Sequence, residues 1–264
     1  MTDHVPDLTG HVEALLPDGA RTWWNQALAR ARDEGPEALP ELFPALRRRI
    51  GTTGLSAGMF RETPYLVDLD AWRACDAAGH VLLEAAGSHD GPATDLFLRG
   101  DLEERTIVLK AMTLRPISPD TIALLGEVQR TNTVRHVEAG VLDANLAVRA
   151  LEAGGPMTGF SQDDLHRLVL KLAFLDLPVA RAYGVLDHAT AELSQMLEDF
   201  AQEREAAGRP VWADTWRFLG RAAIATSRER LAAGLAHAQP EVRAAARDGV
   251  QAFGDADLLK QLDA

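Results

Sequence analysis

A five-residue motif occurs twice in the middle of the chain. The letters IVLKA at 107–111 and LVLKL at 168–172 align at an offset of 61 residues, so that Lys110 corresponds to Lys171. The same offset aligns Glu103 with Asp164. An interval of about 60 residues holds roughly two helical hairpins of 30-odd residues each, which is the size of the units in solenoid proteins. The repetition predicts stacked helical hairpins.

The C-terminal part of the chain resembles one particular helical repeat. Residues 240–246 read PEVRAAA, and residues 253–255 read FGD. This pattern is similar to a HEAT repeat, in which a proline opens a helix and small alanines let the partner helix approach. Ala, Leu, Arg and Glu dominate the composition, while Val, Ile and Thr are few, which favours helix over strand. We therefore predict an all-α fold of HEAT-like helical hairpins, an α-α superhelix or solenoid, with helix above about 60% of residues and almost no strand.

Hydrophobic spacing and helix-end signals locate the expected helices. Apolar residues recur at helical spacing, as in Leu39, Leu42 and Leu46, and prolines and glycines separate the periodic stretches. The expected helices span 19–32, 36–49, 69–86, 101–114, 119–131, 133–151, 161–176, 189–207, 212–237 and 240–262, with interruptions in the last two.

The remaining segments are expected to be less regular. Residues 1–17 are predicted to be a flexible N-terminal arm, and residues 18–264 a single α-helical repeat domain. Residues 50–68 contain several glycines and are expected to be an irregular connection. Within it, GLSAG at 54–58 matches the G-x-S-x-G motif of serine hydrolases, which requires a strand before the serine and a helix after it. A charged helix end precedes the motif here, so we expect Ser56 to be neither strained nor presented as a nucleophile.

The charge, the hydropathy and the cysteine content of the chain limit its partners and its location. The formal net charge is −12, which repels a phosphate backbone, so we expect no nucleic-acid partner. No apolar run approaches the ~18 residues of a transmembrane helix, and we expect no secretory leader. Cys75 is the single cysteine and is expected to be a small packed side chain rather than a nucleophile. These features predict a cytoplasmic protein, or one peripheral at the inner membrane, with no transmembrane span.

Two of the three lysines lie in the repeated motif. Lys110 and Lys171 each follow an acid by seven residues, which places acid and lysine on one helix face. Either each lysine stem covers the core while its ammonium reaches water, or the lysines line a polar groove on the inner surface of the solenoid. The predicted ligand- or partner-binding groove comprises Arg105, Lys110, Arg130, Asn132, Glu138, Asn145, His166 and Lys171.

The sequence holds no strong motif for a cofactor or a metal. The eight histidines form no H-E-x-x-H or comparable pair, and there is no phosphate loop or dinucleotide fingerprint. We therefore expect no metal, no cofactor and no catalytic residues. The five tryptophans are expected to belong mainly to the core rather than to a ligand cage.

A series of short motifs resembles the EboA family of metabolite traffic proteins. The series comprises GDLEER at 100–105, VLKA at 108–111, RTN at 130–132, VEA at 137–139, VLK at 169–171, LSQMLEDF at 193–200, QEREAAGRPV at 202–211 and WR at 216–217. The order and spacing of these motifs carry the resemblance, which is densest over residues 100–220.

The resemblance implies a role rather than a reaction. It implies a bacterial accessory protein, encoded beside a membrane prenyltransferase-like protein and barrel-type enzymes, that assists the movement of a secondary-metabolite precursor toward the periplasm. Its partners would be that small-molecule precursor or the proteins of the same gene cluster. The alternative is an enzyme that acts on a small precursor, with Glu138 or His166 as general base and Lys110 or Lys171 as electrostatic stabiliser or Schiff-base amine. Burial of the lysines distinguishes the two, because a catalytic lysine is desolvated.

Overall fold

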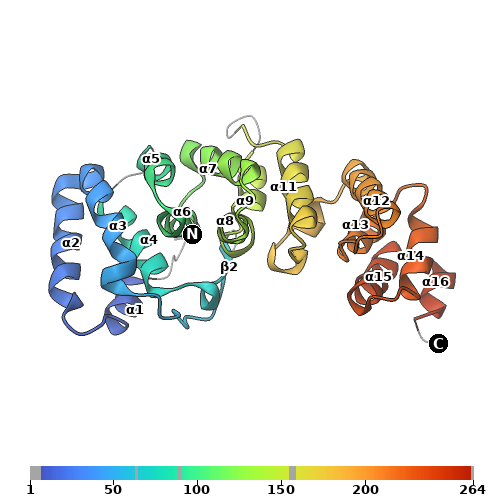
Figure 1. Ribbon diagram of the computed structural model, residues 1–264, viewed down its shortest axis with the longest axis horizontal. Coiled ribbons are helices and arrows are strands. Elements are labelled where there is room, and N and C mark those ends of the chain that lie inside the picture. Colours follow the sequence, from blue (N-terminus) through green and yellow to red (C-terminus); the bar gives the residue numbers. More distant parts are fainter. Residues whose placement is uncertain (1–6, 63–64, 88–90, 155–158, 263–264) are drawn as a thin grey trace. The chain divides into compact units, whose positions relative to one another are not determined.

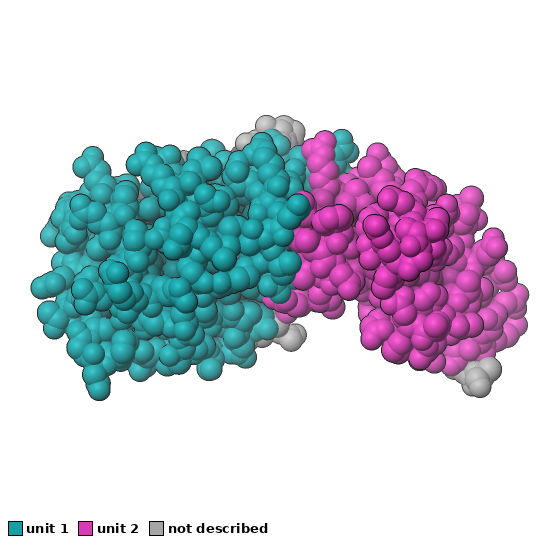
Figure 2. Space-filling model, in the orientation of Figure 1, with its two compact units in different colours: residues 1–165 teal, residues 166–264 magenta. Residues whose placement is uncertain are grey.

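The computed structural model describes residues 7–62, 65–87, 91–154 and 159–262. Helices account for 71% of the structure, which confirms the prediction of an all-α protein with more than about 60% helix. The chain forms two compact units, Met1–Leu165 and His166–Ala264 (Figure 2). The prediction of a single domain over 18–264 differs from this division, and the HEAT-like solenoid stays a prediction.

The described part of the first unit consists of helices and a β-hairpin (Figure 1). Its elements are α1 (Thr9–Ala14), α2 (Ala20–Glu34), η1 (Gly35–Ala38), α3 (Leu39–Ile50), β1 (Met59–Glu62), β2 (Tyr65–Asp68), η2 (Leu69–Ala71), α4 (Ala74–Ala85), α5 (Pro92–Arg99), α6 (Leu102–Ala111), α7 (Pro119–Arg130), α8 (Val134–Val137), the π-helix η3 (Glu138–Asp143) and α9 (Leu146–Glu152). The next helix, α11 (Gln162–Phe174), begins in this unit and continues into the second.

Helix α4 is the centre of the first unit. Nearly all of its residues are buried, and it packs against α1, α2, α3 and α6. Its small residues permit this close packing: a Cβ atom at Gly79 would lie 2.5 Å from Cγ2 of Ile107 on α6. Cys75 on this helix is fully buried, as expected for a packed small side chain.

The segment predicted to be a flexible arm contains helix α1. Leu8 and Val12 are buried there, because α1 packs against α4. Residues 1–6 of the predicted arm lie outside the described residues.

The segment predicted to be an irregular connection holds the two strands of an antiparallel hairpin. Met59 pairs with Asp68, and Glu62 pairs with Tyr65. Ser56 precedes this hairpin and follows α3, so the strand–serine–helix order of a nucleophile elbow is absent from the described part of this region. Ser56 nevertheless has a φ of +51°, so the expectation of an unstrained serine is wrong.

The helix predicted over 133–151 is broken into three pieces. Val134–Val137 is α-helical, Glu138–Asp143 is a π-helix, and Leu146–Glu152 is α-helical again. Asn145 separates the last two with a φ of +49°, a left-handed conformation that asparagine tolerates better than most residues. Such π-helical turns are frequent at functional sites and mark a local departure from regular packing.

The described part of the second unit contains the rest of α11 and seven further elements. They are η4 (Val179–Arg181), η5 (Val185–His188), α12 (Ala191–Ala206), α13 (Thr215–Arg221), α14 (Ser227–Leu235), α15 (Pro240–Phe253) and α16 (Ala256–Lys260). A proline opens α15 and small residues face its neighbours, as the sequence indicated: the backbones of Gly220 on α13 and Gly249 on α15 approach closely. Trp216, Leu231 and Val250 belong to the core of this unit.

The tryptophans are mainly core residues, as predicted. Trp24, Trp72, Trp212 and Trp216 are buried, and Trp23 is half-buried.

Candidate functional site

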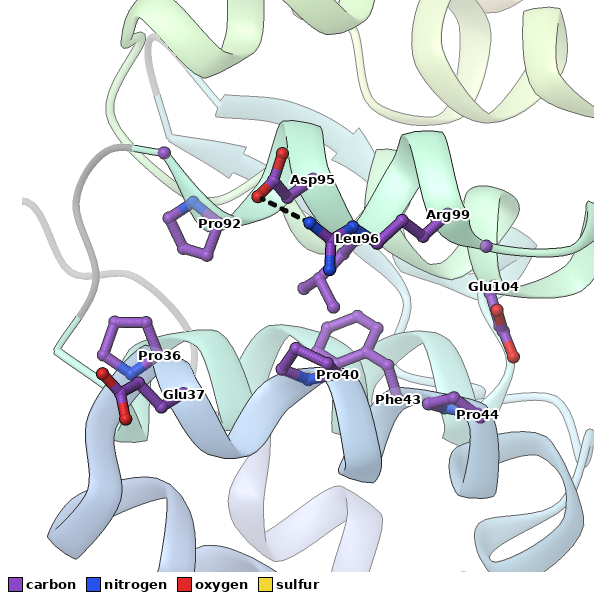
Figure 3. Close-up of a pocket in the computed structure, with 12 residues that line it drawn as sticks. Pro36, Glu37, Pro40, Phe43, Pro44, Pro92, Asp95, Leu96, Arg99 and Glu104 are labelled. Carbon is purple, nitrogen blue, oxygen red and sulfur yellow. Dashed lines mark ion pairs between the residues drawn. The ribbon is translucent and has the colours of Figure 1, made fainter.

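A cavity of the first unit lies between α3 and α5 (Figure 3). Its volume is about 520 Å³, within the range of small-molecule pockets. The twelve residues that line it are Pro36, Glu37, Pro40, Phe43, Pro44, Gly91, Pro92, Asp95, Leu96, Arg99, Gly100 and Glu104. We call this cavity the α3–α5 pocket.

Three prolines form one wall of the α3–α5 pocket. Pro36, Pro40 and Pro44 follow one another at intervals of four residues, which places them on one helix face. Their rings are short and stiff, so they leave space that longer side chains would fill, and proline has no backbone N–H to donate. Pro92 faces them from the first turn of α5 (Figure 3). This wall is rigid, apolar and poor in hydrogen-bond donors.

The floor of the pocket is apolar. Figure 3 shows the side chain of Leu96 on α5 pointing toward the ring of Phe43 on α3. Both residues are buried and join the two helices. A ligand in the pocket would therefore contact hydrocarbon over most of its surface.

Charged side chains surround this apolar floor. The ion pair between Asp95 and Arg99 has a distance of 3.8 Å from Oδ2 to Nη2, and both side chains are exposed. Glu104 Oε2 accepts a hydrogen bond of 2.9 Å from the backbone N–H of Asp101, which caps α6. Glu37 has no ion-pair partner among the described residues. The rim thus carries three carboxylates and one guanidinium.

A smaller hollow of about 330 Å³ adjoins the α3–α5 pocket, because Phe43, Pro44 and Glu104 line both. Arg47 and Arg48 on α3 belong to this second hollow.

Lys110, the central lysine of the repeated motif, is buried with only 6% of its surface exposed. Its Nζ donates a 2.6 Å hydrogen bond to the carbonyl of Ala71. It also lies 3.4 Å from Asp76 Oδ2 and 3.3 Å from Asp143 Oδ2, and both carboxylates are buried. The interpretation in which the ammonium reaches water is therefore wrong for Lys110. Its three protons face three protein oxygens.

The ion pairs continue from Asp76 toward the surface. Arg73 donates to Asp76 Oδ1 at 2.7 Å and to Glu103 Oε2 at 2.7 Å, and Arg135 also donates to Glu103. Hydrogen bonds from Arg135 and Arg73 lower the pKa of Glu103 to about 2. These residues belong to α4, α6 and α8, together with the residue before α4, so this ion-pair network ties the elements of the first unit together.

Cys75 lies next to this network and is fully buried. Burial, and secondarily the charge of Asp76, raises the pKa of its thiol to about 12.

The other predicted groove residues of the first unit lie in differing environments. Arg105 donates to the carbonyls of Gly100 and Leu98, at 2.8 and 3.2 Å, and so braces the turn between α5 and α6. Arg130 is exposed and pairs with Glu127, and Asn132 is exposed. Glu138 is half-buried in the π-helix, whereas Asn145 is buried with an Oδ1 atom that has no hydrogen-bond partner among the described residues.

The last two predicted groove residues belong to the second unit. His166 is buried, and its Nε2 lies 3.0 Å from the hydroxyl of Thr190. Lys171 is half-buried, with its Nζ 5.9 Å from the ring centroid of Phe174. None of the eight predicted residues lines the α3–α5 pocket. The sequence signal that could have indicated the pocket is the four-residue spacing of Pro36, Pro40 and Pro44.

None of the helices in the described part of the chain is both long and apolar enough to cross a bilayer.

Comparison with known proteins gives one match. No curated protein and no solved structure matches the chain significantly. The family model described as metabolite traffic protein EboA matches residues 90–220. This range includes α5, Gly100 and Glu104 of the pocket, together with Lys110 and Asp143 of the ion-pair network. Residues 90–220 of the chain therefore belong to the EboA family.

Proposed function

We propose that this protein is a non-catalytic binding protein of a metabolite-traffic system and that it holds a small molecule in the α3–α5 pocket. The observation that supports this most directly is the pocket itself. It has the volume of a ligand site, and its described lining consists mainly of prolines, glycines, Phe43 and Leu96. The described lining includes no serine, cysteine, histidine or lysine, so its acid–base groups are the carboxylates of Glu37, Asp95 and Glu104.

The family membership supports a more specific role within this proposal. The cargo would be a secondary-metabolite precursor on its way toward the periplasm. The protein would act from the cytoplasm or at the inner membrane, as an accessory to a membrane prenyltransferase-like protein and barrel-type enzymes of the same bacterial gene cluster.

We also propose that the helical hairpins are HEAT-like repeats. The support is the proline-opened helix α15, whose alanines and glycines let α13 approach as the C-terminal motif predicts.

The eight predicted groove residues, six in the first unit and His166 and Lys171 in the second, remain a second set of candidates for contacting a ligand or partner, and an enzyme using Glu138, His166, Lys110 and Lys171 is the alternative. Lys110 is desolvated, as the enzyme alternative requires, but the two carboxylates and the carbonyl around its ammonium favour a binding or structural role over a catalytic one. An ammonium whose protons face Asp76, Asp143 and a carbonyl has no lone pair to offer a substrate carbonyl.

The proposal is tested by blocking the pocket. Pro40 is exposed on its wall, so Pro40→Trp should fill the cavity without disturbing the core. Arg49→Trp is the matched control, because Arg49 is exposed on the same helix and lines neither hollow. Small molecules that co-purify with the wild type and with Arg49→Trp are identified by mass spectrometry and should be lost in Pro40→Trp. Equal retention by all three proteins would contradict the proposal.

A further inference from the structure

The lining of the α3–α5 pocket can accept hydrogen bonds but has few donors to offer. Four of its twelve residues are prolines, which have no backbone N–H. The N–H of Gly91 already donates to Asp120 Oδ2 at 2.8 Å, and the N–H of Gly100 donates to the carbonyl of Leu96 at 2.9 Å. Phe43 and Leu96 have no polar side-chain atoms. Arg99 is therefore the one side chain of the described lining that carries N–H donors.

The charges on the rim likewise favour a ligand that donates hydrogen bonds. Arg99 is placed against Asp95, so this pair contributes little net charge. Glu37 and Glu104 are left over, and they give the lining a net charge of −2. Figure 3 shows Glu37 beside Pro36 at one end of the pocket and Glu104 beyond Pro44 at the other. A ligand that extends along the proline wall meets a carboxylate at either end.

We propose, on the basis of the binding function above, that the α3–α5 pocket selects apolar organic cations, that is, hydrocarbon-rich molecules that carry an amine. The apolar body displaces water from the prolines, Phe43 and Leu96. The ammonium supplies the N–H donors that the carboxylates of Glu37 and Glu104 accept. An anionic molecule of the same shape is disfavoured, because it meets two carboxylates that have no ion-pair partner among the described residues and one guanidinium that already has one.

Three probes of one shape test this selectivity on the full chain. They are 1-naphthylmethylamine, 1-naphthylmethanol and 1-naphthoate, which carry a cationic, a neutral and an anionic group on the same ring system. We expect the amine to bind most tightly and the carboxylate most weakly in calorimetric titrations at low salt. The preference for the amine over the alcohol should shrink as salt is added, since the carboxylates are near the surface.

Substitutions of the two carboxylates assign the effect to the pocket. Glu37→Gln and Glu104→Gln should each weaken binding of the amine by about 1.5- to 5-fold, the range for solvent-accessible ion pairs, and leave binding of the alcohol unchanged. Glutamine at 104 keeps the oxygen that caps α6, so the fold is retained. Asp18→Asn is the matched control. Asp18 is exposed and precedes the first residue of α2, whereas the pocket lining begins after the last residue of that helix.

The outcomes separate the two proposals. If amine and alcohol bind equally and neither glutamine variant has an effect, the pocket binds small molecules but does not select cations. If Asp18→Asn weakens the amine as much as the pocket variants do, the preference arises from net charge and the inference is overturned. If none of the probes binds, or if Pro40→Trp leaves the binding of all three unchanged, the proposed binding function of the pocket is itself refuted.

Discussion

Replacing Lys110 by methionine removes one buried charge and keeps the apolar stem. In the sequence, Lys110 has the features of a residue near the surface, where such a change alters stability by no more than about 0.5 kcal/mol. The structure predicts a much larger effect. Lys110 is 6% exposed, and its ammonium lies within 3.4 Å of two buried carboxylates.

The magnitude follows from the charges that the substitution leaves behind. Asp76 keeps its hydrogen bonds from Arg73, so it loses only one of its positively charged partners. Asp143 loses an ion pair at a site that is 8% exposed, where a carboxylate is poorly solvated. Removing one partner of a buried ion pair typically costs about 3–5 kcal/mol, and we expect Lys110→Met to lower the free energy of unfolding by that amount.

The assay is hydrogen exchange of the α4 and α6 amides, which reports the stability of the first unit. The double variant Lys110→Met, Asp143→Asn also removes the buried negative charge at position 143, so it should lose less stability than the sum of the two single variants, by about 0.5–3 kcal/mol. Lys260→Met is the control, because Lys260 is 77% exposed beside Asp257. A change below 0.5 kcal/mol for Lys110→Met would refute the reasoning.

Further predictions concern acid stability, helix packing and thiol reactivity. The pKa of Glu103 is lowered from 4.5 to about 2, so its contribution to the free energy of unfolding is complete above pH 4.5 and is lost as the pH falls toward 2. In acid denaturation, the Glu103→Gln variant should therefore lose less stability between pH 4.5 and 2 than the wild type. A methyl group at Gly249 would collide with the backbone of Trp216 and lie 2.7 Å from Cδ2 of Leu231, so Gly249→Ala should destabilise the protein by about 1–3 kcal/mol in thermal denaturation. A Cβ atom at Gly126 on α7 would meet only Nη1 of Arg130, at an ordinary contact distance of 3.9 Å, so Gly126→Ala should stabilise the protein by about 0.5–1 kcal/mol. Iodoacetamide should modify Cys75 only after unfolding, because the thiol is buried and has a pKa of about 12; rapid labelling of the native protein would contradict this.

The helices and most of their ends could be predicted from the sequence because local chemistry sets them. Asp101 caps α6 through the N–H groups of Glu103 and Glu104, and Ser118 with Pro119 opens α7. Gly254 ends α15 with a φ of +76°, where a side chain would be strained. These signals are contained within a few residues, and the family resemblance likewise rested on short motifs in order.

The break in the helix predicted over 133–151 could not be foreseen in this way. The residues of that stretch have helical periodicity, but the π-helix ends at the buried Asp143, which pairs with Lys110 on α6. The ion pair joins positions 33 residues apart, so a helical pattern read along one segment does not contain it.

The sequence by itself determined an all-α protein of the EboA family, because helix propensity, helix caps and motif order are properties of neighbouring residues. Only the tertiary structure decided that Lys110 is buried, since its environment is made by α4 and the π-helix rather than by its own helix. The same holds for the α3–α5 pocket, whose walls come from residues 36–44 and 91–104. A cavity is the space that two packed segments fail to fill, and that space depends on the side chains of both walls at once.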